Sequence, residues 1–94
     1  MKSKIIRKIK SLFGKYEQGY EYLVDLEDIE IQIDFLKSHP KNQKMIHKWK
    51  YYNKIGEFES PILLDRNYIL QNGYTSYLIA KTEHMRKVPV YFVD

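Results

Sequence analysis

The residues best suited to chemistry lie in one short turn, where a strand pattern ends and a helix pattern begins. Asn and Gly both tolerate positive φ at little cost, so the chain can reverse direction at Asn72-Gly73. The first N–H groups of the helix that follows have no partner inside it, and the helix dipole adds partial positive charge there. We therefore predict an anion or nucleotide site made of Asn72, Gly73, Tyr74, Thr75 and Ser76.

Residue types that act in catalysis or bind metals in other proteins are scattered along this sequence. His39, His47 and His84 lack the i, i+4 pairing or the nearby carboxylates that are typical of zinc sites. Thr75 and Ser76 have no base at a recognisable spacing, so they are not predicted to be nucleophiles. The chain has no cysteine, which removes thiol nucleophiles and thiolate metal sites. We predict no catalytic residue, no metal site and no cofactor.

One stretch of the chain is rich in carboxylates, namely Asp25, Glu27, Asp28 and Glu30. Its spacing matches no known cation loop, so we interpret it as a solvated strand edge and loop. An enzyme is the alternative function. In that hypothesis the Gly73 turn holds a nucleotide phosphate, and Asp65, Arg66 or an acid of residues 25–30 hydrolyses or transfers it with Mg²⁺.

The elements around the Gly73 turn are predicted from residue type and spacing. Two aliphatic runs, Pro61–Asp65 and Tyr68–Gln71, flank the turn pair Arg66-Asn67 and predict a hairpin. A helix is expected from Tyr74 to about His84. It is followed by a nearly all-apolar strand, Val88–Val93, which we expect to be buried on both faces.

A strand and a helix are predicted before the hairpin. Tyr20–Leu26 alternates as a strand does. Ser38-His39-Pro40 predicts the start of a helix that Ser38 or His39 caps and that Gly56 ends. Trp49 lies at an apolar position of this helix and is predicted to be a core anchor.

The N-terminal segment, residues 1–15, has the pattern of a basic amphipathic helix, with Ile5, Ile6, Ile9, Leu12 and Phe13 at helical spacing. We predict that it packs on the domain of residues 16–94 or on a second copy as a homodimer contact. Binding to an acidic membrane surface is the alternative.

Charge alternates in three blocks along the chain, and the formal net charge is +4. Residues 1–15 and 37–54 are basic without acids, and residues 16–36 are acidic without bases. Such blocks can neutralise one another, so nucleic-acid binding requires the two basic blocks to share a face. The residues that would then contact nucleic acid are Lys2, Lys4, Arg7, Lys8, Lys41, Lys44 and Lys48.

Length and composition indicate one small folded domain. The chain has 94 residues, of which 44% are hydrophobic and 15% are aromatic, which is typical of a globular protein rather than a disordered one. Its longest apolar runs are too short to span a membrane, and it has no signal-peptide pattern. Together with the absence of cysteine, this predicts a cytoplasmic protein without a transmembrane segment.

The order of these elements resembles the ParB N-terminal-like, or ParB/sulfiredoxin, superfamily over about three quarters of the chain. The motifs that carry the resemblance are Val24-Asp25-Leu26 with Asp28-Ile29, Ser38-His39-Pro40 through Ile55-Gly56, Pro61–Asp65, Asn72–Lys81 and Val88-Pro89-Val90. The resemblance implies an α+β fold, a small mixed sheet with packed helices.

Two departures from the family pattern bear on function. Sulfiredoxins have a catalytic cysteine after the turn glycine, where this chain has Tyr74, so their reductase chemistry is excluded. Several relatives have an arginine where this chain has Ser76, so a bidentate phosphate clamp is lost. The resemblance therefore implies a non-catalytic ParB-like domain, an accessory in DNA handling. It is expected to bind nucleic acid, a nucleotide or a protein partner through the Gly73 turn and the basic helices.

Overall fold

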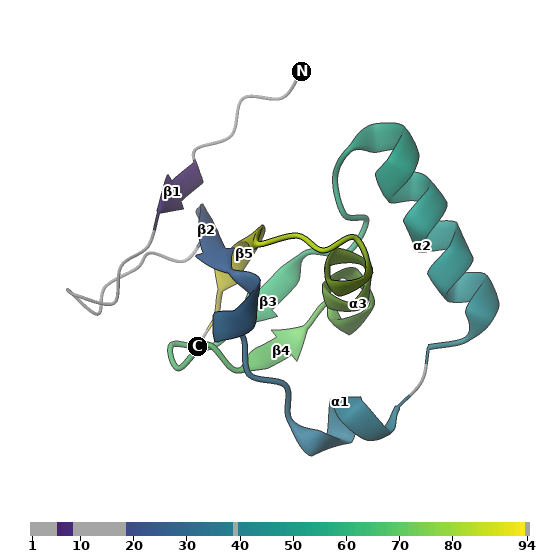
Figure 1. The fold of residues 1–94 in the computed structure, drawn as a ribbon. Helices are drawn as coiled ribbons and strands as arrows, with labels where there is room; N and C mark the ends of the chain where they lie inside the picture. The colour runs from purple at the N-terminus through teal and green to yellow at the C-terminus, as the bar shows by residue number, and fades with distance from the viewer. Residues whose placement is uncertain (1–5, 9–18, 39, 94) are drawn as a thin grey trace.

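A mixed sheet runs through the centre of the computed structural model, which describes residues 6–8, 19–38 and 40–93 (Figure 1). Its five strands lie in the order β1-β2-β5-β3-β4. They are β1 Ile6–Lys8, β2 Glu21–Asp25, β3 Ile62–Leu64, β4 Leu70–Asn72 and β5 Lys87–Phe92. The predicted α+β class with a small mixed sheet is confirmed.

The central strand is β5, which pairs antiparallel with β2 and parallel with β3. Val88, Val90 and Phe92 alternate along it and are fully buried, whereas Pro89 and Tyr91 on the other face are half-buried. The expected burial of both faces is therefore complete on one face only. The core on that face also contains Tyr22, Val24, Ile62, Leu64, Leu70 and Ala80.

The predicted hairpin and turn are confirmed at β3 and β4, which pair antiparallel. Asp65 builds the hairpin turn, because its Oδ1 accepts the backbone N–H groups of Asn67 and Ile69 at 2.8 and 3.0 Å. The chain then passes through Gly73 into α3, Tyr74–Thr82, which confirms the helix that the sequence predicts there. Helix α3 packs against β3 and buries Thr75, Ser76, Ile79 and Ala80.

Among the described residues, three further helices precede the hairpin: the short 3₁₀ helix η2, Leu26–Asp28, then α1, Ile33–Lys37, and α2, Asn42–Ile55. Gly56 ends α2 in the left-handed region at φ 85°, as predicted. The predicted N-terminal cap is wrong for Ser38, which ends α1 and donates its hydroxyl to the carbonyl of Phe35 at 3.0 Å. His39 lies outside the described residues.

Helix α2 does not enter the core. It packs on α3, which separates it from the middle of the sheet (Figure 1), and it has no buried residue. Trp49 is half-buried, and its Nε1 donates to Glu83 Oε2 at 2.7 Å. The prediction of Trp49 as a core anchor is wrong, because α3 already covers the buried face of the sheet.

The N-terminal segment is described only at Ile6–Lys8, where it forms β1 and pairs parallel with β2. For these three residues the helix prediction is wrong. β-branched isoleucine suits a strand, and the edge of β2 offers backbone groups with which this strand pairs. The rest of the predicted helix lies outside the described residues. No helix of the described part of the chain is long and apolar enough to cross a membrane.

Candidate phosphate-binding site

Gly73 lies where β4 meets α3 and touches the backbone at the start of β3. It is buried at φ 88°, and a Cβ atom added to it would lie 2.3 Å from the carbonyl oxygen of Pro61 and 2.8 Å from Ile62 Cα. Only glycine avoids both the strained backbone and this collision. The turn is therefore rigidly held by packing against β3.

The first turn of α3 is open at its amide end. Among the described residues, no side chain caps this helix. Asn72 Oδ1 accepts the N–H of Gly73 at 2.8 Å, which leaves the next amides directed along the helix axis. Partial positive charge at this end favours an anion.

A pocket of about 280 Å³ opens at this end of α3. Helix α2 contributes two lysines to its wall, Lys44 and Lys48, and no acidic residue lies among the described residues that line it. The remaining lining residues are Phe35, Ser38, Pro40, Ser60, Asn72, Gly73, Tyr74 and Thr75. The packing of α2 on α3 thus adds two positive charges to the open helix end.

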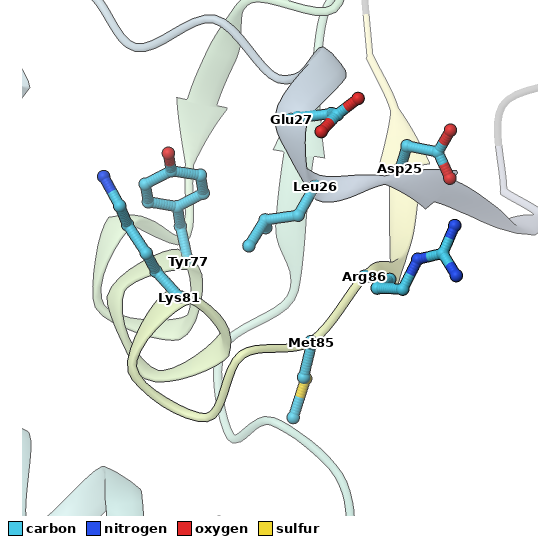
Figure 2. A pocket seen from close by; sticks show the side chains of 7 residues that line it. All are labelled: Asp25, Leu26, Glu27, Tyr77, Lys81, Met85 and Arg86. Carbon is cyan, nitrogen blue, oxygen red and sulfur yellow. The ribbon is translucent and has the colours of Figure 1, made fainter.

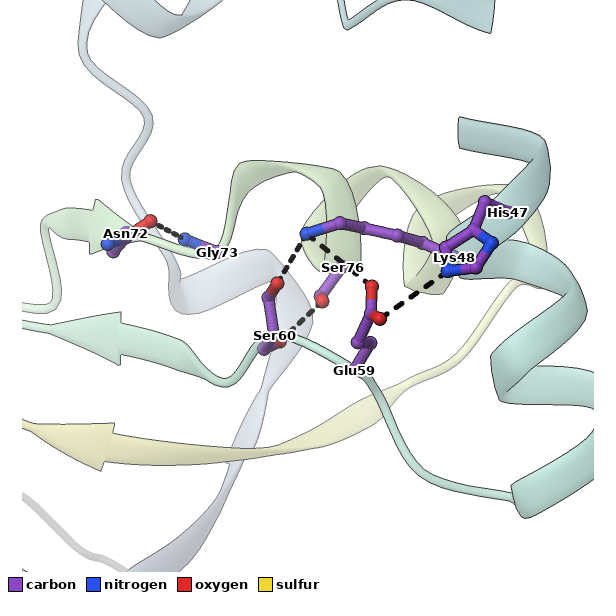
Figure 3. Close-up of polar contacts among 7 residues, drawn as sticks. All are labelled: His47, Lys48, Glu59, Ser60, Asn72, Gly73 and Ser76. Atoms are coloured by element: carbon purple, nitrogen blue, oxygen red, sulfur yellow. Dashed lines mark hydrogen bonds and ion pairs between the residues drawn. The ribbon is translucent and has the colours of Figure 1, made fainter. Parts of the chain in front are cut away.

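The two lysines are held differently. The Lys48 side chain is only 16% exposed, and its amine donates to Ser60 Oγ and lies 4.0 Å from Glu59 Oε1 (Figure 3). Glu59 also lies 3.6 Å from His47 Nε2. Lys44 is exposed. Lys48 is therefore a positioned charge that Glu59 partly offsets, whereas Lys44 is the more solvent-accessible of the two.

The structure separates the predicted anion site into two parts. Asn72, Gly73, Tyr74 and Thr75 line the pocket. Ser76 is 1% exposed, and its hydroxyl donates to the Ser60 carbonyl at 2.5 Å, so it packs the turn against the chain before β3. Ser38 and Ser60 also line the pocket, but they were not among the predicted site residues, because no local pattern in the sequence indicates that they approach Gly73.

The predicted nucleic-acid residues do not form one group. Lys44 and Lys48 line the pocket, and Lys41 is exposed just before α2. Arg7 and Lys8 belong to β1, at the opposite edge of the sheet from β4. Lys2 and Lys4 lie outside the described residues.

Two residues of the acidic stretch, Asp25 and Glu27, line a different pocket, of about 390 Å³, between β2, η2 and α3. Figure 2 shows Asp25 and Glu27 on one side of it and Tyr77 and Lys81 projecting from α3 on the other, with Arg86 near Asp25. In the part of the chain that the structure describes, no three acids and histidines come close enough to hold a metal ion.

Comparison with known proteins identifies the fold. No protein-family model matches the sequence, and no curated protein matches it either. Two solved structures of a pNOB8-like ParB N-domain are similar over 79% of this chain, one of them the C2221 form, at 27% identity and a TM-score of 0.66. The other has 28% identity and a TM-score of 0.62.

The chain has a ParB N-terminal-like fold. It spans only 29% and 28% of the lengths of the two solved ParB chains. The order of short motifs, from the Pro-led helix to the closing Val88-Pro89-Val90 strand, was therefore a correct guide to the ParB-like fold.

Proposed function

We propose that this ParB-like domain is a non-catalytic binding module that holds a phosphate group of a nucleotide at the Gly73 pocket. The observation that carries the proposal is the meeting of two α2 lysines with the uncapped amide end of α3 in one cavity. Backbone amides would donate to the phosphate oxygens, and the ammonium groups would offset the charge. Thr75 and Asn72, which line the same pocket, offer further polar contacts.

The arrangement favours a compact phosphate ligand over a long nucleic acid. A nucleic acid needs a continuous basic track, whereas β1 and the Gly73 pocket lie toward opposite edges of the sheet. A role as an accessory in DNA handling and a protein partner remain parts of the proposal that the family resemblance supports. A cytoplasmic location remains a part of the proposal that the sequence without cysteine supports.

The enzyme alternative is less well supported. Asp65 uses Oδ1 to hold its own turn, through Asn67 and Ile69, and it does not line the pocket. Asp25 and Glu27 line the other pocket, beside α3. A catalytic acid must lie within hydrogen-bond reach of the reacting group, so these acids make poor candidates.

Calorimetric titration with each of the four ribonucleoside triphosphates, with and without Mg²⁺, tests the proposal. We expect one of them to bind. Lys44→Gln should weaken binding about tenfold or more, because each charge-assisted contact contributes about 1.5–3 kcal/mol. Lys50→Gln is the matched control, since Lys50 is an exposed α2 lysine that does not line the pocket.

Two outcomes would overturn the proposal. One is no heat of binding for any triphosphate at millimolar concentration. The other is an equal loss of triphosphate affinity in Lys44→Gln and in Lys50→Gln. Titration with a labelled 20-base-pair duplex distinguishes the source of the phosphate. Tighter binding of the duplex than of every nucleotide would replace a nucleotide with nucleic acid as the ligand.

A further inference from the structure

The pocket of about 390 Å³ between β2, η2 and α3 has no part in the proposed function. It shares no lining residue with the Gly73 pocket, so it is a separate site. Its volume lies within the range of about 300–1,000 Å³ that is typical of sites for whole small molecules. The pocket therefore has room for a complete small molecule.

Half-buried apolar groups line this pocket. They are Leu26 of η2, the ring of Tyr77 and Met85 in the loop after α3. The Leu26 N–H donates to the carbonyl of Arg86 at 2.8 Å, which connects η2 to the residue before β5. The Tyr77 ring stacks on Tyr74, with centroids 6.2 Å apart and planes at 13°. These contacts hold an apolar wall in place, and such a wall can take the methylene groups of a ligand.

Four charged side chains line the same pocket, and one of them already has a partner of opposite charge. Asp25 Oδ1 lies 2.5 Å from the amine of Lys87, a residue that does not line the pocket. Glu27, Lys81 and Arg86 are exposed, and their side chains make no ion pair or hydrogen bond within the described part of the chain. Two positive charges and one negative charge are therefore left for a ligand.

Figure 2 shows how these three charges are distributed around the pocket. Tyr77 and Lys81 are four residues apart on α3, and both project from the same face of this helix. Glu27 projects from η2 on the other side of the pocket, and Arg86 lies on that side near Asp25. The two positive charges thus face the pocket from different elements, with the acid at a third position.

We infer that this pocket binds a free amino acid that carries two carboxylates. One carboxylate would contact Lys81 and the Tyr77 hydroxyl, and the other would contact Arg86, whose guanidinium can donate two parallel hydrogen bonds. The ammonium group of the ligand would contact Glu27. Two negative charges and one positive charge on the ligand match the three charges that the pocket leaves without partners. The inference stands independently of nucleotide binding.

NMR titration of the ¹⁵N-labelled full chain with L-glutamate and with L-aspartate, at constant ionic strength, tests the inference. We expect at least one of them to give saturable amide shifts at Glu27, Lys81 and Arg86. Binding should be in the millimolar range, because exposed charges are screened by water and salt. Glutarate lacks the ammonium group and glutamine lacks the second carboxylate, so each should bind about threefold more weakly than glutamate.

Variants connect the shifts to the pocket. Lys81→Gln, Arg86→Gln and Glu27→Gln should each weaken glutamate binding about threefold. Because these side chains are exposed, all three variants should fold. Glu27→Gln should also reduce the difference in affinity between glutamate and glutarate, since it removes the partner of the ammonium group. Lys54→Gln and Asp34→Asn are the matched controls, as both replace exposed residues that do not line the pocket.

Four outcomes would overturn the inference. Absence of saturable shifts with both amino acids would exclude the ligand class. Equal affinity for glutamate, glutarate and glutamine would exclude recognition of the three charges. Unchanged glutamate affinity in the three pocket variants would exclude this site. Tighter binding of the blocked peptide acetyl-Ala-Ala-Glu-Ala-Ala-amide than of glutamate would replace the free amino acid with an acidic polypeptide.

Discussion

Gly56 and Gly73 have almost the same backbone conformation and very different surroundings. Gly56 ends α2 at φ 85°, and no other part of the described chain lies within 4 Å of an added Cβ. Gly73 begins α3 at φ 88°, with the backbone of Pro61 and Ile62 directly against it. A methyl group at Gly56 therefore meets backbone strain alone, whereas one at Gly73 meets backbone strain and a collision with β3.

We predict that Gly56→Ala lowers the free energy of unfolding by about 1 kcal/mol, the usual cost of left-handed φ for alanine. Gly73→Ala should lower it by about 3 kcal/mol or more, because backbone atoms cannot move aside as a flexible side chain can. Urea denaturation of the two variants measures both values. Equal losses would mean that the close approach of Gly73 to Pro61 is not made in solution.

Tyr68 gives a pH-dependent prediction. Its backbone is left-handed at φ 65°, and its ring packs edge-on against Phe92, with centroids 5.4 Å apart. Burial, followed by the negative charges of Asp28 and Asp25, raises the pKa of Tyr68 above its ordinary value of 10.0. The folded state therefore holds the phenol proton more tightly than the unfolded chain does.

The stability that this raised pKa contributes is fully present below about pH 10 and is lost as the pH rises through the folded-state pKa. Tyr68→Phe removes the ionisable hydroxyl and keeps the ring. We expect the unfolding free energy of the unmodified chain to fall more steeply than that of Tyr68→Phe between about pH 9 and pH 11. Parallel pH profiles of the unfolding free energy in the two proteins would contradict the raised pKa of Tyr68.

At the scale of elements, α2 is attached more weakly than the strands. It has no buried residue, and it leaves Ile46 53% and Ile55 49% exposed. Its described polar link to α3 is the exposed hydrogen bond from Trp49 to Glu83. An element with little buried apolar surface opens at a lower free energy than the core does.

Native-state hydrogen exchange should therefore show at least two levels of opening free energy, a lower one for α2 and a higher one for the core strands. We expect the α2 amides to exchange with an opening free energy well below that of Val88, Val90 and Phe92 in β5. Glu83→Ala removes the acceptor for Trp49 and should accelerate exchange in α2 while leaving β5 unchanged. Exchange of α2 and β5 at one common rate would show that α2 unfolds only with the core.

At the scale of the whole molecule, the order of the strands in the sheet decides whether the basic residues gather on one face. The order β1-β2-β5-β3-β4 places the described basic residues of β1 at one edge. The Gly73 pocket follows β4 at the other edge and receives Lys44 and Lys48 from α2. The net charge of +4 is thus divided between separate regions instead of forming one basic face.

The salt dependence of any nucleic-acid binding should reflect this division. Duplex binding releases about 0.9 counterion per phosphate contacted, so two lysines predict a slope of about −2 for log K against log salt. All seven predicted basic residues acting together would give about −6. Fluorescence polarisation with a labelled duplex over a range of salt measures the slope, and a value near −6 would contradict separate basic regions.

The sequence by itself determined the local elements and their order. The pair Arg66-Asn67 predicts the hairpin turn, Gly73 predicts the reversal, and the Gly56 stop predicts the end of α2, because each depends on backbone preferences within a few residues. In combination they were specific enough to indicate a ParB-like fold. The open end of α3 was predicted for the same reason.

Only the tertiary structure decided which segments meet. The approach of Lys44 and Lys48 to Gly73 and the half-burial of Trp49 depend on α2 packing against α3. The hydrogen bond from the Ser76 hydroxyl to the Ser60 carbonyl depends on α3 packing beside β3. Contacts between segments far apart in the chain leave no periodic pattern in either segment. An amphipathic stripe shows that a face will be covered, and the geometry of the whole sheet decides what covers it.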